Sequence, residues 1–261
     1  MDGCDALQCR HWNQHSEHHR NTIPYPLSPI PMRLLALDTS TEACSVALLL
    51  DDVLRLRFEL TERSHADLVL PMVDELLAEA GVALADLDGL AFGRGPGAFT
   101  GLRIATGVAQ GLALGADLSV AAISSLAAVA EQVPAAVGET ILVCNDARMG
   151  EVYWAVYQRN EASIVRSTPE SVSVPDRVGE GVTEVRHAAG NAFARYPALA
   201  ARLLAEGLQL HDGIYPRADA VARLGALELA AGRGVPAEMA LPVYIRDDVA
   251  RPATRIVTQV S

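Results

Sequence analysis

The segment at residues 93–115, GRGPGAFTGLRIATGVAQGLALG, constrains the fold more than any other part of this sequence. The apolar residues 90–92 predict a strand that runs into a turn rich in glycine. A helix is then expected to begin at Phe99 or Thr100 and to continue to about Leu114. The chain should therefore contain a strand, a tight turn and a helix in direct succession.

Three glycines form a stripe along this helix. Gly107, Gly111 and Gly115 recur every four residues and so share one face. Each glycine inside a helix costs about 1 kcal/mol relative to alanine. The stripe favours close packing of another backbone against that face, because close approach recovers the loss. The neighbour is either part of the same lobe or a second protein, and the sequence leaves both interpretations open.

The glycine-rich turn also has two interpretations. Gly93, Gly95 and Gly97 could let backbone N–H groups point at an anion near the start of a helix, with Arg94 and Arg103 adding positive charge. The alternative is a tight connection between strand and helix. Neither G-x-x-x-x-G-K-[ST] nor G-x-G-x-x-G is present, so the turn alone does not establish a phosphate site.

Composition excludes several classes of function. The 261 residues allow one large domain or two small ones. All 21 basic residues are arginine, which excludes a Walker lysine, a Schiff-base lysine and a lysine general base. The formal net charge of −11 argues against unaided binding of nucleic acid. Any RNA should therefore be held by a partner.

A cytoplasmic protein without a membrane segment is expected. No apolar run approaches about 20 residues, and the first thirty residues lack the hydrophobic core of a signal peptide. The cysteines show no spacing typical of a metal site or a disulfide framework; they are Cys4, Cys9, Cys44 and Cys144. A reducing compartment fits this pattern best.

Residues 1–31 are expected to form a disordered extension outside the fold. They lack sustained periodicity and contain the proline-rich run IPYPLSPIP. A misassigned start codon before Met32 is a second interpretation. A metal site is a third, because the extension contains Cys9, His11, His15, His18 and His19.

Two segments of the chain resemble each other. Residues 34–49, LLALDTSTEACSVALL, align without gaps on residues 142–157, LVCNDARMGEVYWAVY. Each reads as a strand, an acidic turn and a second strand, and Asp38 aligns with Asp146. The match favours an internal duplication, and chance similarity between two hairpins is the alternative.

The rest of the chain predicts alternating strands and helices. A helix at 64–80 should begin with a Ser64–Asp67 capping box and end at Gly81, with Pro71 marking a kink or the true first turn. Shorter apolar runs predict strands at 53–60, 118–122 and 164–167 and helices at 124–131 and 218–231. The segment 159–209 gives only weak signals.

Two hairpins with an acid at each turn, one in each half of an α/β chain, resemble the superfold of actin, sugar kinases and heat-shock-protein ATPases, which has two RNase H-like lobes. The resemblance implies turns that embrace nucleotide phosphates and acids that orient magnesium. Asp38, Thr39 and Ser40 resemble the first phosphate turn. Asp146 would be the second acid, but an arginine and a methionine follow where active members have small residues. The resemblance therefore implies vestigial turns.

The chain is identified as a member of the bacterial TsaB (YeaZ) family by the segments MRLLALDTSTEACSVALL, GRGPGAFTGLRIATGVAQGLALG, DARMGEVYWAVY and PVYIRDDVA. The resemblance covers Met32 to about Ala250. It implies a first actin-like lobe at 32–135 that is joined by a helix at about 218–232. The second lobe would be at 136–217, and a strand and loose tail at 233–261.

The family implies a non-catalytic scaffold subunit that is an inactive paralogue of TsaD. The subunit pairs with TsaD, works with the ATPase TsaE, and supports threonylcarbamoyl transfer to adenosine 37 of tRNAs that read ANN codons. TsaC supplies the threonylcarbamoyl-adenylate. This chain alone would bind no cofactor, whereas the complex uses ATP and magnesium. It would contact tRNA only through the complex and form a homodimer when TsaD is missing.

No metal site is expected in this chain. TsaD binds a metal through an H-x-x-x-H pair on a helix. At the matching helix this chain has His65, and Val69 stands four residues later.

Two other functions remain as alternatives. The older naming of the family as a glycoprotease implies a glycoprotease-like metallopeptidase. Ser64, His65 and Asp67 are residue types found in proteases, but adjacent residues at a helix start cannot adopt triad geometry. An autonomous ATPase or kinase would use Asp38 and Asp146 as magnesium ligands. That hypothesis requires tight ATP binding by the isolated chain.

The helices at 64–80 and 99–114 are expected to form the surface that meets TsaD, or a second copy of this chain. The residues assigned to it are Leu68, Met72, Leu76, Arg103, Gly107 and Gly111.

Overall fold

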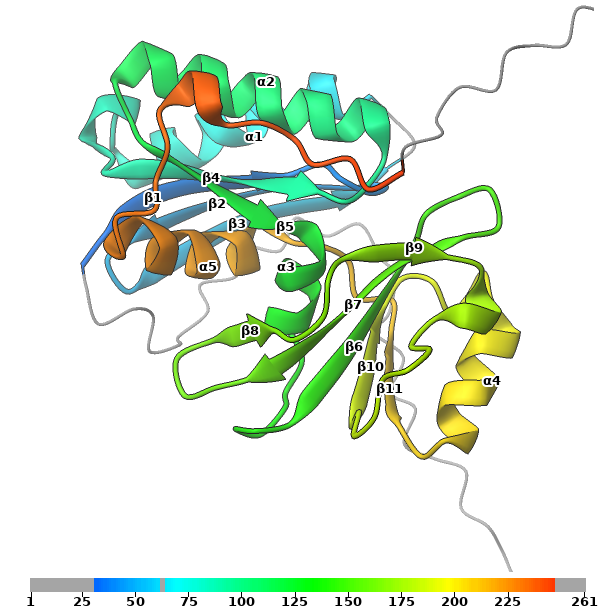
Figure 1. Cartoon of the computed structure of the whole chain (residues 1–261). Helices are drawn as coiled ribbons and strands as arrows, with labels where there is room; N and C mark the ends of the chain where they lie inside the picture. Colours follow the sequence, from blue (N-terminus) through cyan, green and yellow to red (C-terminus); the bar gives the residue numbers. More distant parts are fainter. Residues whose placement is uncertain (1–30, 62–63, 247–261) are drawn as a thin grey trace, which may run out of the picture.

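The computed structural model describes residues 31–61 and 64–246 of the chain. Figure 1 shows two α/β lobes, each built on its own sheet, which confirms the expected fold class. The histidine-rich part of the expected extension and the tail beyond residue 246 lie outside the described residues. No helix in the described ranges is long and apolar enough to cross a membrane.

The first sheet has the strand order β3-β2-β1-β4-β5. Its members are β1 (Arg33–Asp38), β2 (Ala43–Leu50), β3 (Val53–Leu60), β4 (Gly89–Gly95) and β5 (Val120–Ser124). The first three strands form an antiparallel meander, and β4 and β5 run parallel to β1. Strands β1 and β2 are mostly apolar and almost fully buried, whereas β3 alternates apolar residues with charged ones, as expected for an edge strand with one face on the core.

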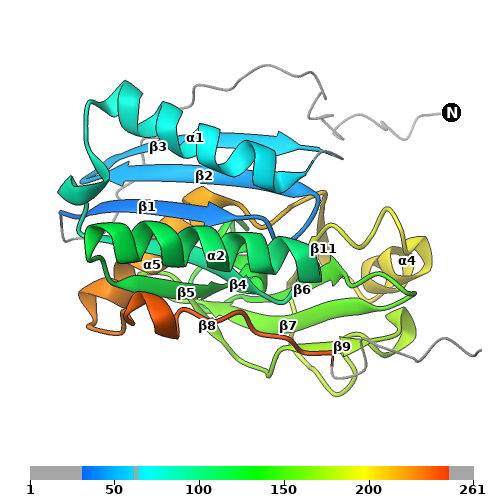
Figure 2. The same ribbon diagram turned by 90° about the horizontal axis from the view of Figure 1, so that it is seen from above.

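Two long helices cover the outer face of this sheet, as Figure 2 shows from above. They are α1 (His65–Ala80) and α2 (Phe99–Ala116). Gly81 ends α1 in the left-handed conformation, with φ of 66°, as the sequence predicts. The capping box is wrong, because the side chain of Ser64 makes no capping hydrogen bond. Pro71 lies inside α1.

The second sheet repeats this order as β8-β7-β6-β10-β11, with β9 added beside β7. Its members are β6 (Thr140–Asp146), β7 (Val152–Arg159), β8 (Ile164–Arg166), β9 (Ser171–Ser173), β10 (His187–Gly190) and β11 (Gln209–Asp212). Strands β6 and β7 form a hairpin, and β10 and β11 run parallel to β6. The repeated order supports the duplication suggested by the two hairpin sequences.

Strands β9, β10 and β11 and the helix α4 (Pro197–Ala205) are not predicted by the sequence. The strand β10 reads HAAG, which contains no β-branched residue, so it depends on pairing with its neighbours β6 and β11. Pro197 at the start of α4 is a residue that favours the first turn of a helix, so the sequence did contain a signal from which this helix could have been predicted.

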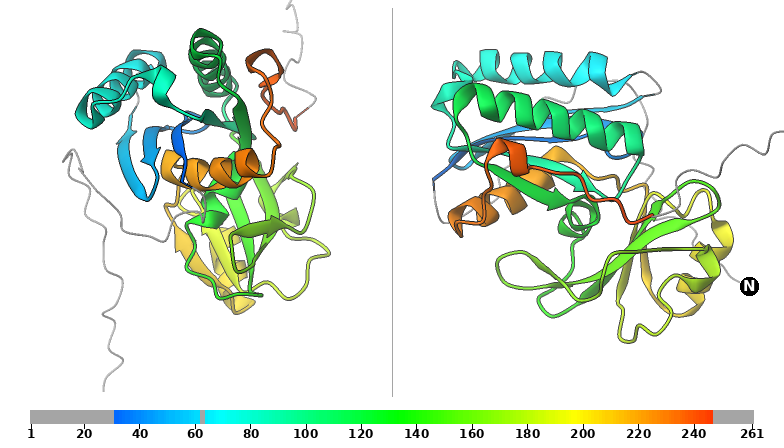
Figure 3. Two further views of the ribbon diagram at one scale, coloured as in Figure 1. Left: turned by 90° about the vertical axis from the view of Figure 1, so that its left-hand side faces the viewer. Right: turned by 45° about the horizontal axis from the view of Figure 1, so that its top comes forward.

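Two helices lie between the sheets, as Figure 3 shows. The short α3 (Ser125–Glu131) follows β5 but packs also against β6 and β7 of the second lobe. The last helix, α5 (Ala218–Ala230), follows β11 and packs on β1, β2, β4 and β5 of the first lobe. Each lobe therefore contributes a helix to the other, and both helices share one apolar core with the inner faces of the two sheets.

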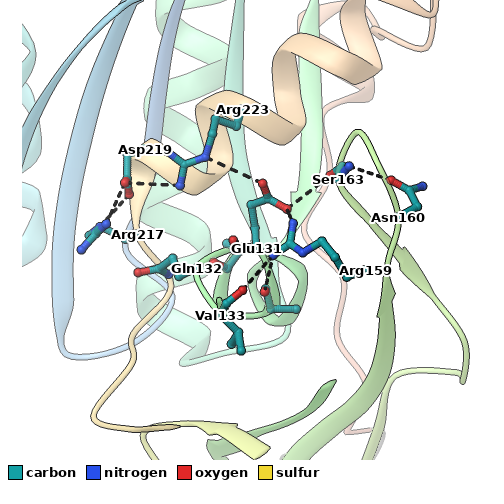
Figure 4. Close-up of polar contacts among 11 residues, drawn as sticks. Glu131, Gln132, Val133, Arg159, Asn160, Ser163, Arg217, Asp219 and Arg223 are labelled. Carbon is teal, nitrogen blue, oxygen red and sulfur yellow. Dashed lines mark hydrogen bonds and ion pairs between the residues drawn. The ribbon is translucent and has the colours of Figure 1, made fainter. Parts of the chain in front are cut away.

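A chain of charged side chains reinforces this crossover (Figure 4). Arg159 of β7 lies 2.8 Å from Glu131 at the end of α3 and also donates to carbonyl groups there. Arg223 of α5 lies 3.8 Å from the same carboxylate and 3.5 Å from Asp219. Asp219 is fully buried and accepts two hydrogen bonds from Arg217, at 2.6 and 2.8 Å. Charges from both lobes thus meet at α3.

Candidate functional site

The first hairpin turn is closed to solvent. Asp38, Thr39 and Ser40 each expose no more than 1% of their surface. One carboxylate oxygen of Asp38 accepts hydrogen bonds from the backbone N–H and the hydroxyl of Ser40, at 2.8 and 2.7 Å. The other accepts from the hydroxyl of Ser125 at the start of α3, at 3.1 Å. The sequence gives no signal for Ser125 as a partner, because it lies 87 residues away.

The glycine-rich loop packs directly against this turn. A Cβ atom on Gly93 would lie 1.7 Å from Oδ2 of Asp38. The corresponding distances are 2.3 Å from Gly97 to the carbonyl oxygen of Ser40 and 1.9 Å from Gly101 to that of Thr39. These glycines allow the loop and the start of α2 to pack closely against the first hairpin turn of the same lobe. The structure therefore favours the tight connection over an open phosphate cradle.

The environment of Asp38 is that of a buried structural acid. Burial raises the pKa of this carboxyl above its usual value, against the opposing effect of the hydrogen bonds from Ser40 and Ser125. A magnesium ligand needs an oxygen that faces the ion. Both oxygens of Asp38 instead face hydroxyl and amide donors of the chain itself.

The gapless alignment of the two hairpins places the second acid wrongly. Alternation along β1 puts Asp38 on the inner face with Leu34 and Ala36. Along β6 the inner residues are Ile141 and Val143, so the next inner position is Asn145. The structural counterpart of Asp38 is therefore an asparagine.

The glycines beside the two turns support this equivalence. A Cβ atom on Gly190 would meet the side-chain oxygen of Asn145 at 2.8 Å, as one on Gly93 would meet Asp38. Asn145 is 1% exposed, and neither atom of its amide has a hydrogen-bond partner among the described residues. The position that matches Asp38 in the second lobe therefore carries a neutral amide.

Asp146 points to the outer face of the sheet, where its carboxylate is hydrogen-bonded and paired with arginines. Its carboxylate accepts hydrogen bonds from the backbone N–H of Arg148 and from the hydroxyl of Tyr196, both at 2.9 Å. The guanidinium groups of Arg148 and Arg195 lie 3.5 and 3.6 Å away. Three partners from two segments therefore surround this acid, and the sequence predicted none of them.

The second turn also reaches across to the first lobe. The guanidinium of Arg148 lies 3.6 Å from the carboxylate of Glu42 in the first hairpin turn. Arg148, Met149 and Gly150 are all left-handed, with φ of 60°, 55° and 81°. This backbone directs Met149 outward, where 78% of its surface is exposed. The backbone of the second turn therefore differs from that of the first, where no residue has a positive φ.

The two arginines of the glycine-rich segment are also engaged. Arg94 donates two hydrogen bonds of 3.2 Å to Glu170, which belongs to the second lobe. Arg103 lies over the ring of Phe99, with 3.8 Å between the guanidinium carbon and the ring centre. It also donates to the hydroxyl of Tyr244 at 3.3 Å. Neither is grouped with the loop glycines around an anion site.

The glycine stripe of α2 faces solvent. Gly107, Gly111 and Gly115 are exposed, and a Cβ atom on any of them would meet nothing within 4 Å outside the helix's own backbone. The stripe therefore does not pack inside its own lobe. The assignment of Met72 and Leu76 to the same exposed surface is wrong, because both are buried in the core beneath α1.

The remaining candidates at the start of α1 do not assemble a site. Leu68 is half-buried, and Ser64, His65 and Asp67 are linked in the described part of the chain only by a backbone bond from Asp67 to Ser64. No group of three histidine, cysteine or carboxylate side chains within the described ranges is arranged to hold a metal ion. The structure thus brings together no protease-like set here.

Comparison with known proteins gives one consistent result. The family model described as "TsaD: tRNA N6-adenosine threonylcarbamoyltransferase" matches residues 59–211. The tRNA threonylcarbamoyladenosine biosynthesis protein TsaB of Escherichia coli (strain K12) is 43% identical over 226 residues, which are 84% of this chain and 96% of that protein. The Haemophilus influenzae protein of the same name is 51% identical over 131 residues, or 50% of this chain and 56% of that protein. Among solved structures, YeaZ from Pseudomonas aeruginosa has a TM-score of 0.72 and 42% identity, covering 82% of this chain and 99% of that one.

Proposed function

Because the chain belongs to the TsaB (YeaZ) family, we propose that it acts in tRNA threonylcarbamoyladenosine biosynthesis as the non-catalytic partner of TsaD. In this role it supports threonylcarbamoyl transfer to adenosine 37 of tRNAs that read ANN codons. TsaE joins the pair as the ATPase. The complex, rather than this chain, holds tRNA, ATP and magnesium, and it works in the cytoplasm.

The exposed glycine stripe is the observation that carries this proposal. Gly107, Gly111 and Gly115 each weaken α2 by up to about 1 kcal/mol, and no residue in the described ranges covers them. A helix of a second protein can approach this face more closely than a side chain would allow. TsaD is the partner in the proposal, and a second copy of the chain uses the same face when TsaD is missing.

The state of the hairpin turns supports the non-catalytic role. Asp38 is buried against its own lobe, and Asn145 offers no charge at the matching position. Asp146 is held by Tyr196 and two arginines. A magnesium-dependent ATPase needs free carboxylates at these turns. None of the three side chains supplies one in this arrangement.

The substitution Gly111→Leu tests the proposed surface. Because Gly111 is exposed with open space above it, we expect the free chain to remain folded with an unchanged or slightly higher melting temperature. The leucine should hold a facing helix away and weaken TsaD binding at least about tenfold, which corresponds to ~1.4 kcal/mol. Binding can be measured by calorimetry, and tRNA modification in cells should fall with it.

A matched control is Ala201→Leu, which adds the same side chain at an exposed position of α4 in the second lobe. It should leave TsaD binding unchanged. Normal binding by the Gly111→Leu chain would contradict the proposal. Unfolding of that chain would instead mean that the stripe packs within its own lobe.

A further inference from the structure

A strap formed by residues 234–246 leaves α5 and crosses the first lobe (Figures 1 and 2). It begins as a one-residue extension of the sheet, where Val235 and Val120 exchange backbone hydrogen bonds of 2.8 and 2.9 Å. Ala237 and Ala240 are then buried in the core, in and just after a 3-10 turn (Ala237–Met239) that packs against α2. The strap is thus part of the first lobe.

The second half of the strap lies on the glycine-rich loop and α2. The side-chain amide of Gln110 donates to the carbonyl oxygen of Ala240 at 3.1 Å. The backbone N–H of Val243 donates to the carbonyl oxygen of Arg94 at 2.8 Å. A Cβ atom on Gly95 would lie 2.9 Å from the carbonyl oxygen of Val243. The strap is therefore seated at a fixed position beside α2.

The end of the strap reaches the second lobe. Arg246 forms an ion pair with Glu151, and its guanidinium lies 3.5 Å from the sulfur of Met149. The side chain of Arg246 is 16% exposed and that of Glu151 is 34% exposed, so the pair is partly shielded from solvent. One continuous surface thus runs from α2 to the second hairpin turn.

Large apolar side chains stand exposed along this path. We call them the strap ridge; they are Phe99 (42% exposed), Leu114 (76%), Met149 (78%), Met239 (59%), Leu241 (56%) and Tyr244 (43%). The rings of Phe99 and Tyr244 pack with 5.4 Å between their centres. Arg103 lies over the ring of Phe99 and donates a hydrogen bond to the hydroxyl of Tyr244.

The composition of the ridge is that of a protein interface. Aromatic residues, methionine and arginine are enriched in such interfaces, whereas aspartate, glutamate and lysine are depleted. Residues that act as binding hot spots are often tyrosine and arginine. One exposed acidic residue, Glu238, lies in the strap beside Met239. The charged neighbour of the ridge on α2, Arg103, calls for a carboxylate on the partner.

We propose that the strap ridge forms the second half of the surface that binds TsaD, and that it meets an apolar partner face with a carboxylate opposite Arg103. This inference rests on the proposed function. Continuity argues for the same partner, because Leu114 and Arg103 lie on α2 with the glycine stripe and the strap packs along that helix. A helix placed on the stripe would have the ridge beside it.

The test compares three substitutions of exposed leucine or methionine by aspartate. Leu241→Asp and Met239→Asp place a carboxylate on the ridge, and Leu204→Asp places one on the exposed face of α4. All three should remain folded, because each side chain is at least half exposed. We expect both ridge variants to weaken TsaD binding at least about tenfold in calorimetry, with Leu204→Asp unchanged.

Arg103→Glu is expected to weaken binding as well, and more strongly at low salt. Wild-type affinity of both ridge variants would overturn the inference. If Gly111→Leu still abolished binding in that case, the proposed function would stand and only the ridge would be rejected. If Leu204→Asp weakened TsaD binding as much as the ridge variants do, the ridge would also be rejected, because the loss of affinity would then follow from the added negative charge and not from its position.

Discussion

Asp38 is, at the scale of one residue, an acid at the end of a strand whose surroundings give it a structural role. Its carboxylate is fully buried and is hydrogen-bonded by Ser40 and Ser125. The burial raises its pKa, which means that the folded protein resists its ionisation. Asn145, at the matching position of the second lobe, avoids this cost by being neutral. Replacing the acid of Asp38 by the amide found at Asn145 therefore tests this interpretation.

We expect Asp38→Asn to be at least as stable as the wild type at pH 7. The raised pKa means that ionising Asp38 destabilises the fold, by about 1.4 kcal/mol for each unit of increase. This penalty is present above the folded pKa and disappears as the pH falls toward the unfolded value of 3.8. The advantage of the variant should shrink over the same range in urea unfolding curves.

The same variant separates the scaffold from an ATPase. We expect normal tRNA modification by Asp38→Asn, and no heat when ATP and magnesium are titrated into the isolated wild-type chain. Tight ATP binding that the substitution abolishes would contradict the non-catalytic role.

The segment that runs from the end of β4 through α2 contains two groups of glycines with opposite roles. Gly93, Gly97 and Gly101, before and within the first turn of the helix, touch the backbone or carboxylate of the first hairpin turn. A Cβ atom on Gly107 or Gly111, further along, would meet no atom of the described residues within 4 Å outside the helix's own backbone. In the sequence both groups look alike, because helical spacing shows which residues share a face but does not identify what lies opposite.

Two alanine substitutions distinguish these roles. Gly93→Ala should lower the free energy of unfolding by at least about 3 kcal/mol, because its Cβ would overlap the Asp38 carboxylate in a packed region. Gly107→Ala should stabilise it by up to about 1 kcal/mol through helix propensity. Thermal unfolding of the free chains measures both, and a destabilised Gly107→Ala chain would show that the stripe is covered within the monomer.

At the scale of the whole molecule, the exchange of α3 and α5 joins the lobes. Glu131 lies at the end of α3 between Arg159 of the second lobe and Arg223 of α5. Its side chain is only 10% exposed. Removing one member of a buried ionic group leaves the other charges without compensation, which is costly. The two lobes should therefore unfold together rather than separately.

We expect Glu131→Gln to lower the free energy of unfolding by about 3 kcal/mol, because Arg159 and Arg223 lose their shared carboxylate. The control Glu180→Gln breaks an exposed pair with Arg177 and should change it by less than about 0.5 kcal/mol. Urea unfolding followed by two probes, one in each lobe, makes the comparison. Separate transitions in the wild type would contradict cooperative unfolding of the lobes.

The sequence by itself determined the α/β fold class, the long helices α1 and α2, the hairpins and the family, because these depend on local periodicity and on specific motifs. Only the tertiary structure decided that Asn145 rather than Asp146 matches Asp38. A shift of one residue moves every side chain of a strand to the other face, and sequence alignment does not resolve such a shift. The same limit applies to Met72 and Leu76, whose burial depends on which face of α1 meets the sheet. Contacts between residues far apart in the chain set these directions, and no local pattern records them.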